Sequence, residues 1–161
     1  MLVDEYIQIA KDEFPYLFEQ DFKFLYKYQG EMRDLGRFAF GIESANYHMR
    51  ILFSRQQGGG MIYFGPLTAS FYAEYPYPKE LSYPYEWVEI AKLLRYLNQK
   101  PLDWSVLDRY QGEDQIRPSF HLISQSLMHH FPGVLEMFSS ADAIDKWKPQ
   151  YQEFFHKVHG R

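Results

Sequence analysis

The stretch from Tyr47 to Phe64, YHMRILFSRQQGGGMIYF, constrains the fold of this chain more than any other. Its apolar set, Tyr47, Met49, Ile51 and Phe53, falls on one face of an extended strand, and His48, Arg50 and Ser54 fall on the other, with Leu52 as the exception. The glycines at 58–60 permit the positive φ values that a tight reversal needs, and a second apolar strand follows them. The pattern predicts an antiparallel hairpin with one buried and one wet face.

Two further strands are predicted before this hairpin. In residues 22–28 aromatic side chains alternate with Lys23, Leu25 and Lys27, which predicts a strand with Phe22, Phe24, Tyr26 and Tyr28 on one face. Residues 37–44 form another, with Phe38, Phe40 and Ile42 inward. After Gly65-Pro66, residues 67–74 are a candidate fifth strand at the sheet edge.

Helices are predicted on both sides of this region. Apolar residues recur at three- and four-residue spacing in 2–13, and Phe14-Pro15 should break that helix. The second half carries a helical stripe of Trp87, Ile90, Ala91, Leu94 and Leu97, followed by helical patterns near 103–110, 118–131, 132–138 and 140–158. Pro149 should kink the last helix.

Strands early and helices late predict an α+β fold: an N-terminal helix, an antiparallel sheet of four or five strands, and a C-terminal helical half packed on it. We expect one domain over 1–161, with a helix-and-sheet part at 1–74 and a helical part at 86–161. A Tyr/Pro loop at 75–85 links them, because three prolines in eleven residues disfavour helix and strand pairing. Two subdomains meeting at that loop are the alternative.

Composition excludes several classes of protein. The chain lacks cysteine, which removes disulfides, thiol nucleophiles and Cys-ligated zinc and suits a reducing cytoplasm. A net charge of −4 argues against nucleic-acid binding. The N-terminus lacks the pattern of a signal peptide, and no apolar run is long enough for a membrane span. We therefore expect a cytoplasmic protein with neither nucleic acid nor membrane as partner.

The histidines do not predict a metal site. His121 and His129 are eight residues apart, about 12 Å of helical rise, so they cannot share one ion. Adjacent His129 and His130 diverge on a helix. Glu153, His156 and His159 share a face, but they lie at the C-terminus and lack the second Glu-x-x-His step of di-iron bundles. We expect no metal and no cofactor.

Catalytic motifs are missing as well. The sequence has no G-x-S-x-G elbow, and no Lys-Ser or Lys-Thr follows the glycines at 58–60 to make a phosphate loop. No catalytic residue can be named, so the sequence favours a protein that is not an enzyme.

The polar face of the sheet is the candidate binding surface. If each strand turns its apolar set inward, the outer face and its edge carry a mixed-charge, mainly basic set: Lys23, Lys27, Arg37, Glu43, His48, Arg50 and Arg55. Such a surface could steer an acidic partner. An ordinary solvated face is the alternative, and on either reading Arg50 is expected to be a free surface charge.

Residues 15–65 carry a recurring set of short motifs. These are Tyr16-Leu17 with Glu19, Asp21-Phe22-Lys23, Glu43-Ser44, and a strand from Arg50 to Arg55 before a glycine turn. The set resembles small uncharacterised bacterial proteins, some of which are similar to immunity or accessory components of conflict systems. An Asp-Arg-Gly turn often follows the third strand there, whereas this chain has Ser54-Arg55-Gln56. The resemblance implies a bacterial, cytoplasmic, non-enzymatic protein.

Two hypotheses of function follow. The leading one is an immunity-like or accessory factor that binds another protein. The alternative is a small-molecule binding or enzymatic domain, with an aromatic pocket between sheet and helices lined by Tyr75, Tyr77, Trp104 and His121. A homodimer formed through surplus tyrosines, of which the chain has 14, is a third possibility.

Overall fold

The computed structural model describes residues 1–30, 38–56, 59–71, 87–98 and 113–158. Their helices are α1 (Val3–Glu13), α2 (Pro15–Phe18), α3 (Ile90–Asn98), the short 3₁₀ helix η4 (Glu113–Gln115), α4 (Ile116–Met128), α5 (Phe131–Met137) and α6 (Ala141–Val158). Their strands are β1 (Phe22–Gln29), β2 (Phe38–Ser44), β3 (Arg50–Gln56), β4 (Gly59–Gly65) and β5 (Val88–Glu89).

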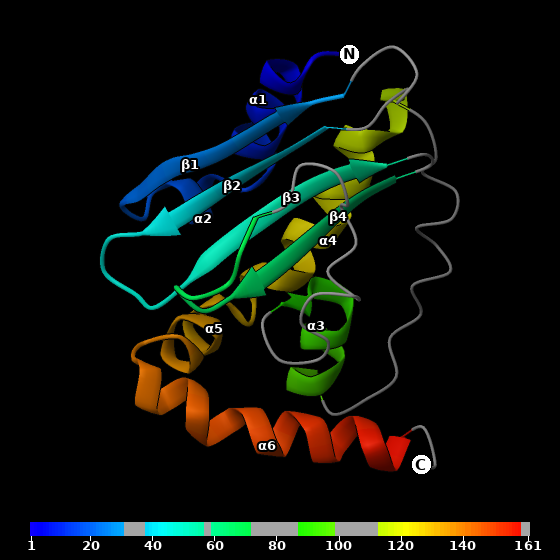
Figure 1. Cartoon of the computed structure of the whole chain (residues 1–161). Coiled ribbons are helices and arrows are strands. Elements are labelled where there is room, and N and C mark those ends of the chain that lie inside the picture. The colour runs from blue at the N-terminus through cyan, green and yellow to red at the C-terminus, as the bar shows by residue number, and fades with distance from the viewer. Residues whose placement is uncertain (31–37, 57–58, 72–86, 99–112, 159–161) are drawn as a thin grey trace.

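The strands form one five-stranded antiparallel sheet in the order β1-β2-β3-β4-β5 (Figure 1). Neighbouring strands in the chain are therefore neighbours in the sheet. An N-terminal helix precedes the sheet and helices follow it, so the predicted α+β fold is confirmed. Among the described residues, no helix is both long and apolar enough to cross a membrane.

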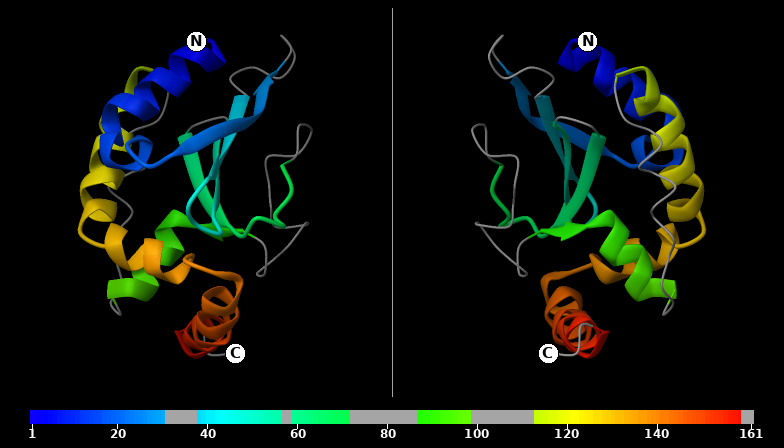
Figure 2. Two further views of the ribbon diagram at one scale, coloured as in Figure 1. Left: turned by 90° about the vertical axis from the view of Figure 1, so that its left-hand side faces the viewer. Right: turned by 90° about the vertical axis from the view of Figure 1, so that its right-hand side faces the viewer.

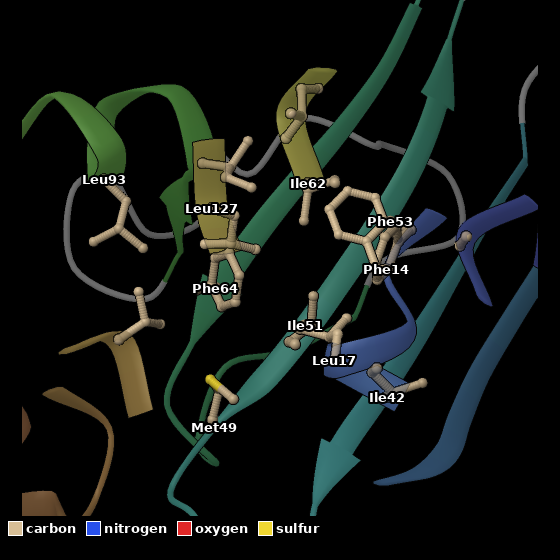
Figure 3. Packing of buried hydrophobic residues seen from close by; sticks show 14 of the residues in the cluster. Phe14, Leu17, Ile42, Met49, Ile51, Phe53, Ile62, Phe64, Leu93 and Leu127 are labelled. Carbon is tan, nitrogen blue, oxygen red and sulfur yellow. The ribbon is translucent and has the colours of Figure 1, made fainter. Parts of the chain in front are cut away.

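Helices α1, α4 and α5 lie on one side of the sheet, and residues 66–71, which follow β4, lie on the other (Figure 2). The helix side holds the main core, which includes residues of α1, α3, α4, α5 and α6 together with β2, β3 and β4. Phe40, Phe53 and Phe120 are all fully buried there. Figure 3 shows this packing around Phe53, Ile51 and Phe64.

The predicted hairpin is confirmed as β3 and β4. Met49, Ile51 and Phe53 are buried on the helix side, because alternate residues of a strand point to the same face. The predicted wet face is wrong, since the opposite side of the sheet carries a second cluster of buried side chains. We call it the outer cluster, and its buried members are Ala39, Leu52, Tyr63, Ala69 and Trp87.

Strand β1 departs from the predicted alternation. Phe24 is opposite Ile42 and Tyr26 is opposite Gly41, so Leu25 is an extra residue with no partner in β2. This bulge reverses the faces beyond it, because a one-residue shift turns every later side chain to the other side. Phe22 and Phe24 lie on the helix side as predicted, but Tyr26 and Tyr28 pack on the outer cluster.

Three other predictions are tested by these elements. The break at Pro15 is confirmed, because α1 ends at Glu13 and α2 begins at Pro15. The fifth strand is Val88–Glu89 rather than 67–74, whose described part, up to Phe71, is not a strand. Helix α3 begins at Ile90, so Trp87 belongs to the outer cluster and not to the helical stripe. The predicted loop 75–85 and the predicted helix near 103–110 lie outside the described residues.

Candidate functional site

Three of the predicted site residues come together on the outer face. Glu43 on β2 is opposite Lys23 of β1 and Arg50 of β3 in the strand register. Arg50 Nε donates to Glu43 Oε1 at 2.9 Å, and Lys23 Nζ lies 3.5 Å from Glu43 Oε2. Burial alone would raise the pKa of Glu43, but the hydrogen bond and charge of Arg50, with those of Lys23, outweigh it and lower this pKa. The carboxylate is therefore held ionised between two cations.

Arg50 is not the free surface charge that the sequence predicts. Besides Glu43, its guanidinium donates from Nη1 to the carbonyl oxygen of Ala69 at 2.6 Å. It also lies over the ring of Phe71, 5.3 Å from the centroid. These contacts hold the segment after β4 against the sheet, so Arg50 has a structural role at the margin of the outer cluster.

Phe71 covers the centre of the outer face. A Cβ atom on Gly41 would lie 2.2 Å from Phe71 Cε1, so the ring rests directly on the β2 backbone. Phe71 stacks on Tyr26 with centroids 5.5 Å apart, and it contacts Trp87 at 5.6 Å. Trp87 in turn donates from Nε1 to Ser70 O at 3.0 Å. Burial raises the pKa of Tyr26 to about 12. Among the described residues, the outer cluster and the rings packed on it cover this part of the sheet.

The other predicted members of the binding face lie elsewhere. Lys27 follows the bulge and pairs with Asp4 of α1, so it lies on the helix side. Arg55 is opposite the buried Phe38 and is itself buried on the helix side. His48 lies in the connection between β2 and β3, where its backbone N–H donates to Phe138 O at 2.7 Å. Arg37 lies outside the described residues.

His121 does not line a pocket between sheet and helices, as the alternative hypothesis required. This residue is exposed on α4, where Nδ1 is 3.0 Å from Glu13 Oε2 and Nε2 is 3.0 Å from Gln125 Nε2. It joins α4 to α1 on the outer surface of the helices. Tyr75, Tyr77 and Trp104 lie outside the described residues.

The part of the chain that the structure describes contains no group of three or more His, Asp or Glu side chains that could hold a metal ion. His130 Nε2 is instead 2.9 Å from Asn98 Oδ1, which links α5 to α3. Glu153 pairs with Lys157 on α6 at 3.1 Å.

A hollow of about 340 Å³ lies nearby, lined by Tyr96, Gln150, Glu153, Phe154 and Lys157. It is a shallow, open depression between α3 and α6.

The β1 edge is a surface feature that the sequence did not predict. We define it as Phe22–Gln29, and no other described strand pairs with its free side. Phe24 is 46% exposed and Leu25 is 41% exposed, side by side on this strand. The alternation of residues 22–28 predicts Phe24 in the core and no function for Leu25, because an alternating pattern does not reveal a bulge.

Comparison with known proteins supplies no further assignment. No protein-family model, curated protein or solved structure matches this chain. The resemblance of residues 15–65 to small bacterial proteins stays an expectation.

Proposed function

We propose that this protein is a non-enzymatic, immunity-like or accessory factor of the bacterial cytoplasm that binds another protein through the β1 edge. The observation that carries the proposal is the pair of exposed apolar side chains, Phe24 and Leu25, on an edge strand whose outer side pairs with no other described strand. An extended segment of the partner would add to the sheet as a further strand. In that mode backbone hydrogen bonds supply affinity, and alternate side chains supply specificity.

Phe24 is held in place for such a contact. Its ring lies 5.9 Å from Phe40 and 6.5 Å from Phe18, so the core fixes one side of it. Lys11 Nζ lies 5.2 Å from its centroid. A partner would cover the remaining exposed side of a ring that is already ordered, which lowers the entropy cost of binding.

Lysines define the chemistry of the partner. Lys23 and Lys27 flank Phe24 and Leu25 in sequence, and Lys11 covers Phe24 from α1. Lys23 is 69% exposed, and its contact with Glu43 is loose at 3.5 Å. Edge lysines and a bulge discourage indiscriminate strand pairing. They favour an extended segment that carries Asp or Glu, which gains from charge complementarity.

Site-specific photocrosslinking in the native host tests the proposal. A benzophenone amino acid replaces Leu25, which has no partner in β2, and the control replaces Met128, an exposed apolar residue at the end of α4. We expect a discrete adduct with another protein from position 25 and none from position 128. Mass spectrometry should place the crosslink in an extended, acidic segment of that protein.

A charge placed beside the probe sharpens the test. In the variant with the benzophenone amino acid at position 25, Phe24→Asp should abolish the adduct. Circular dichroism of this double variant should show an intact fold. Adducts between two copies of this chain would replace the proposed partner with a homodimer. The same adduct from positions 25 and 128, or none from either, would overturn the proposal.

A further inference from the structure

Arg55 is a buried cation for which no hydrogen bond or ion pair is found among the described residues. It is 5% exposed, and it lies on β3 opposite Phe38 and Gly60 of the neighbouring strands. Neither its Nε nor its Nη1 has a hydrogen-bond partner among the described residues. No carboxylate of those residues forms an ion pair with it either.

A second unpaired donor lies beside it. Tyr6 on α1 is fully buried, and its hydroxyl also has no hydrogen-bond partner among the described residues. A Cβ atom on Gly60 would lie 3.1 Å from this hydroxyl, so the glycine lets the oxygen approach the strand next to Arg55. Burial raises the pKa of Tyr6, and the charge of Arg55 lowers it by less. The phenol therefore stays protonated and can donate.

Apolar rings pack against Tyr6, and one of them belongs to Phe38, the residue opposite Arg55. The Tyr6 ring lies 4.8 Å from Phe38 and 5.4 Å from Phe120. A guanidinium in such surroundings loses its hydration, and an unpaired buried charge is among the costliest features that a fold can carry. The guanidinium of Arg55 and the hydroxyl of Tyr6 can both donate hydrogen bonds, and the positive charge of Arg55 favours a negatively charged acceptor.

We propose that Arg55 and Tyr6 form a binding site for a small oxyanion, a carboxylate or phosphate group. The guanidinium supplies the charge and planar N–H donors, and the phenol supplies one O–H donor. Gly60 lets the Tyr6 hydroxyl and the Phe120 ring lie close to the strand beside Arg55. The site lies at the opposite side of the sheet from the outer cluster and does not use the β1 edge, so it stands or falls independently of the proposed function.

Thermal unfolding in defined anions tests the site. Sodium acetate and sodium phosphate are each exchanged for sodium chloride at constant pH and ionic strength, so that general salt effects cancel. A ligand that binds only the folded state raises the Tm in a saturable way. We expect that rise for the wild type with at least one of the two anions, and the anion that acts identifies the ligand group as carboxylate, phosphate or both.

Three variants locate the effect. Arg55→Met should remove the response, while Arg117→Met, which changes an exposed arginine on α4, should keep it. Tyr6→Phe should weaken the apparent affinity about 2- to 12-fold, the value of one net hydrogen bond. It removes a single oxygen and so remains informative even if Arg55→Met does not fold.

The opposite results are equally clear. A wild type whose Tm responds to neither anion would overturn the proposal, and so would an unchanged response in Arg55→Met. In the first case Arg55 is either paired within the chain or simply destabilising.

Discussion

The rings of Phe40 and Phe53 lie nearly parallel on neighbouring strands, with centroids 4.6 Å apart and planes 7° from each other. The two residues are opposite each other in the register of β2 and β3. Phe14 and Phe120 meet Phe53 from the helix side at 5.9 and 6.0 Å. This stack therefore joins the sheet to the helices at the centre of the main core.

Phe53→Ala tests the importance of this stack. The side chain is fully buried, so its removal should leave a cavity and cost about 3–5 kcal/mol of unfolding free energy. Met128→Ala removes a half-exposed side chain from α4 and should change stability by about 0.5 kcal/mol at most. Urea melts measure both, and equal effects would mean that the rings of Phe40 and Phe53 do not form the core.

Gly41→Ala tests the closure of the outer face. The new methyl group would collide with Phe71, and displacing that ring should cost about 1–3 kcal/mol. Gly133 on α5 is the matched control, because a Cβ there meets nothing within 4 Å and Gly133→Ala should stabilise by about 0.5–1 kcal/mol. In a double-mutant cycle with Phe71→Ala, the costs should fall short of additive by about 0.5–3 kcal/mol. Strict additivity would place Phe71 away from Gly41.

Arg50→Met should be far costlier than Lys23→Met, although both lysine and arginine contact Glu43. Arg50 donates to Glu43 and to the Ala69 carbonyl, so its loss should cost about 1.5–3 kcal/mol. Lys23 is largely exposed, and its loss should cost about 0–1 kcal/mol. Urea midpoints distinguish the two variants. Equal, small costs would restore the free surface charge that the sequence predicted for Arg50.

Glu43 should make stability depend on pH on the acid side. Its folded pKa is lowered from an ordinary 4.5, so the ionised carboxylate stabilises the folded state above that value. This contribution should disappear as the pH falls through the folded pKa. Urea melts of wild type and Glu43→Gln should differ more at neutral pH than in acid, and the difference should shrink as the pH falls below 4.5. A difference that grows on acidification would contradict the lowered pKa.

The hairpin and the helix-side core could be predicted because both depend on local alternation. Met49, Ile51 and Phe53 alternate in the sequence and are buried on one side of the sheet. The outer cluster could not be predicted in this way. Leu52 breaks the alternation, and Ala69 and Trp87, which cluster with it, are distant from it in the sequence.

The candidate site depended on which face each strand presents. One unpaired residue, Leu25, moves Lys27 to the helix side, because side chains beyond a bulge change faces. Arg55 was assigned to an open edge from its charge alone. It lies instead opposite Phe38, a contact that only the pairing of β2 with β3 creates. The periodicity of a single strand predicts neither the bulge at Leu25 nor the position of Arg55 opposite Phe38.

Affinity measurements with the purified partner test the central claim, that the β1 edge binds protein, most directly. The protein captured by crosslinking is titrated with wild type, Phe24→Asp and Met128→Asp, at low and at high salt. We predict that Phe24→Asp weakens binding by about tenfold or more, about 1.4 kcal/mol, while Met128→Asp binds like wild type. Salt should slow association, because lysines attract an acidic segment. Equal affinities of the two variants would show that the partner binds elsewhere.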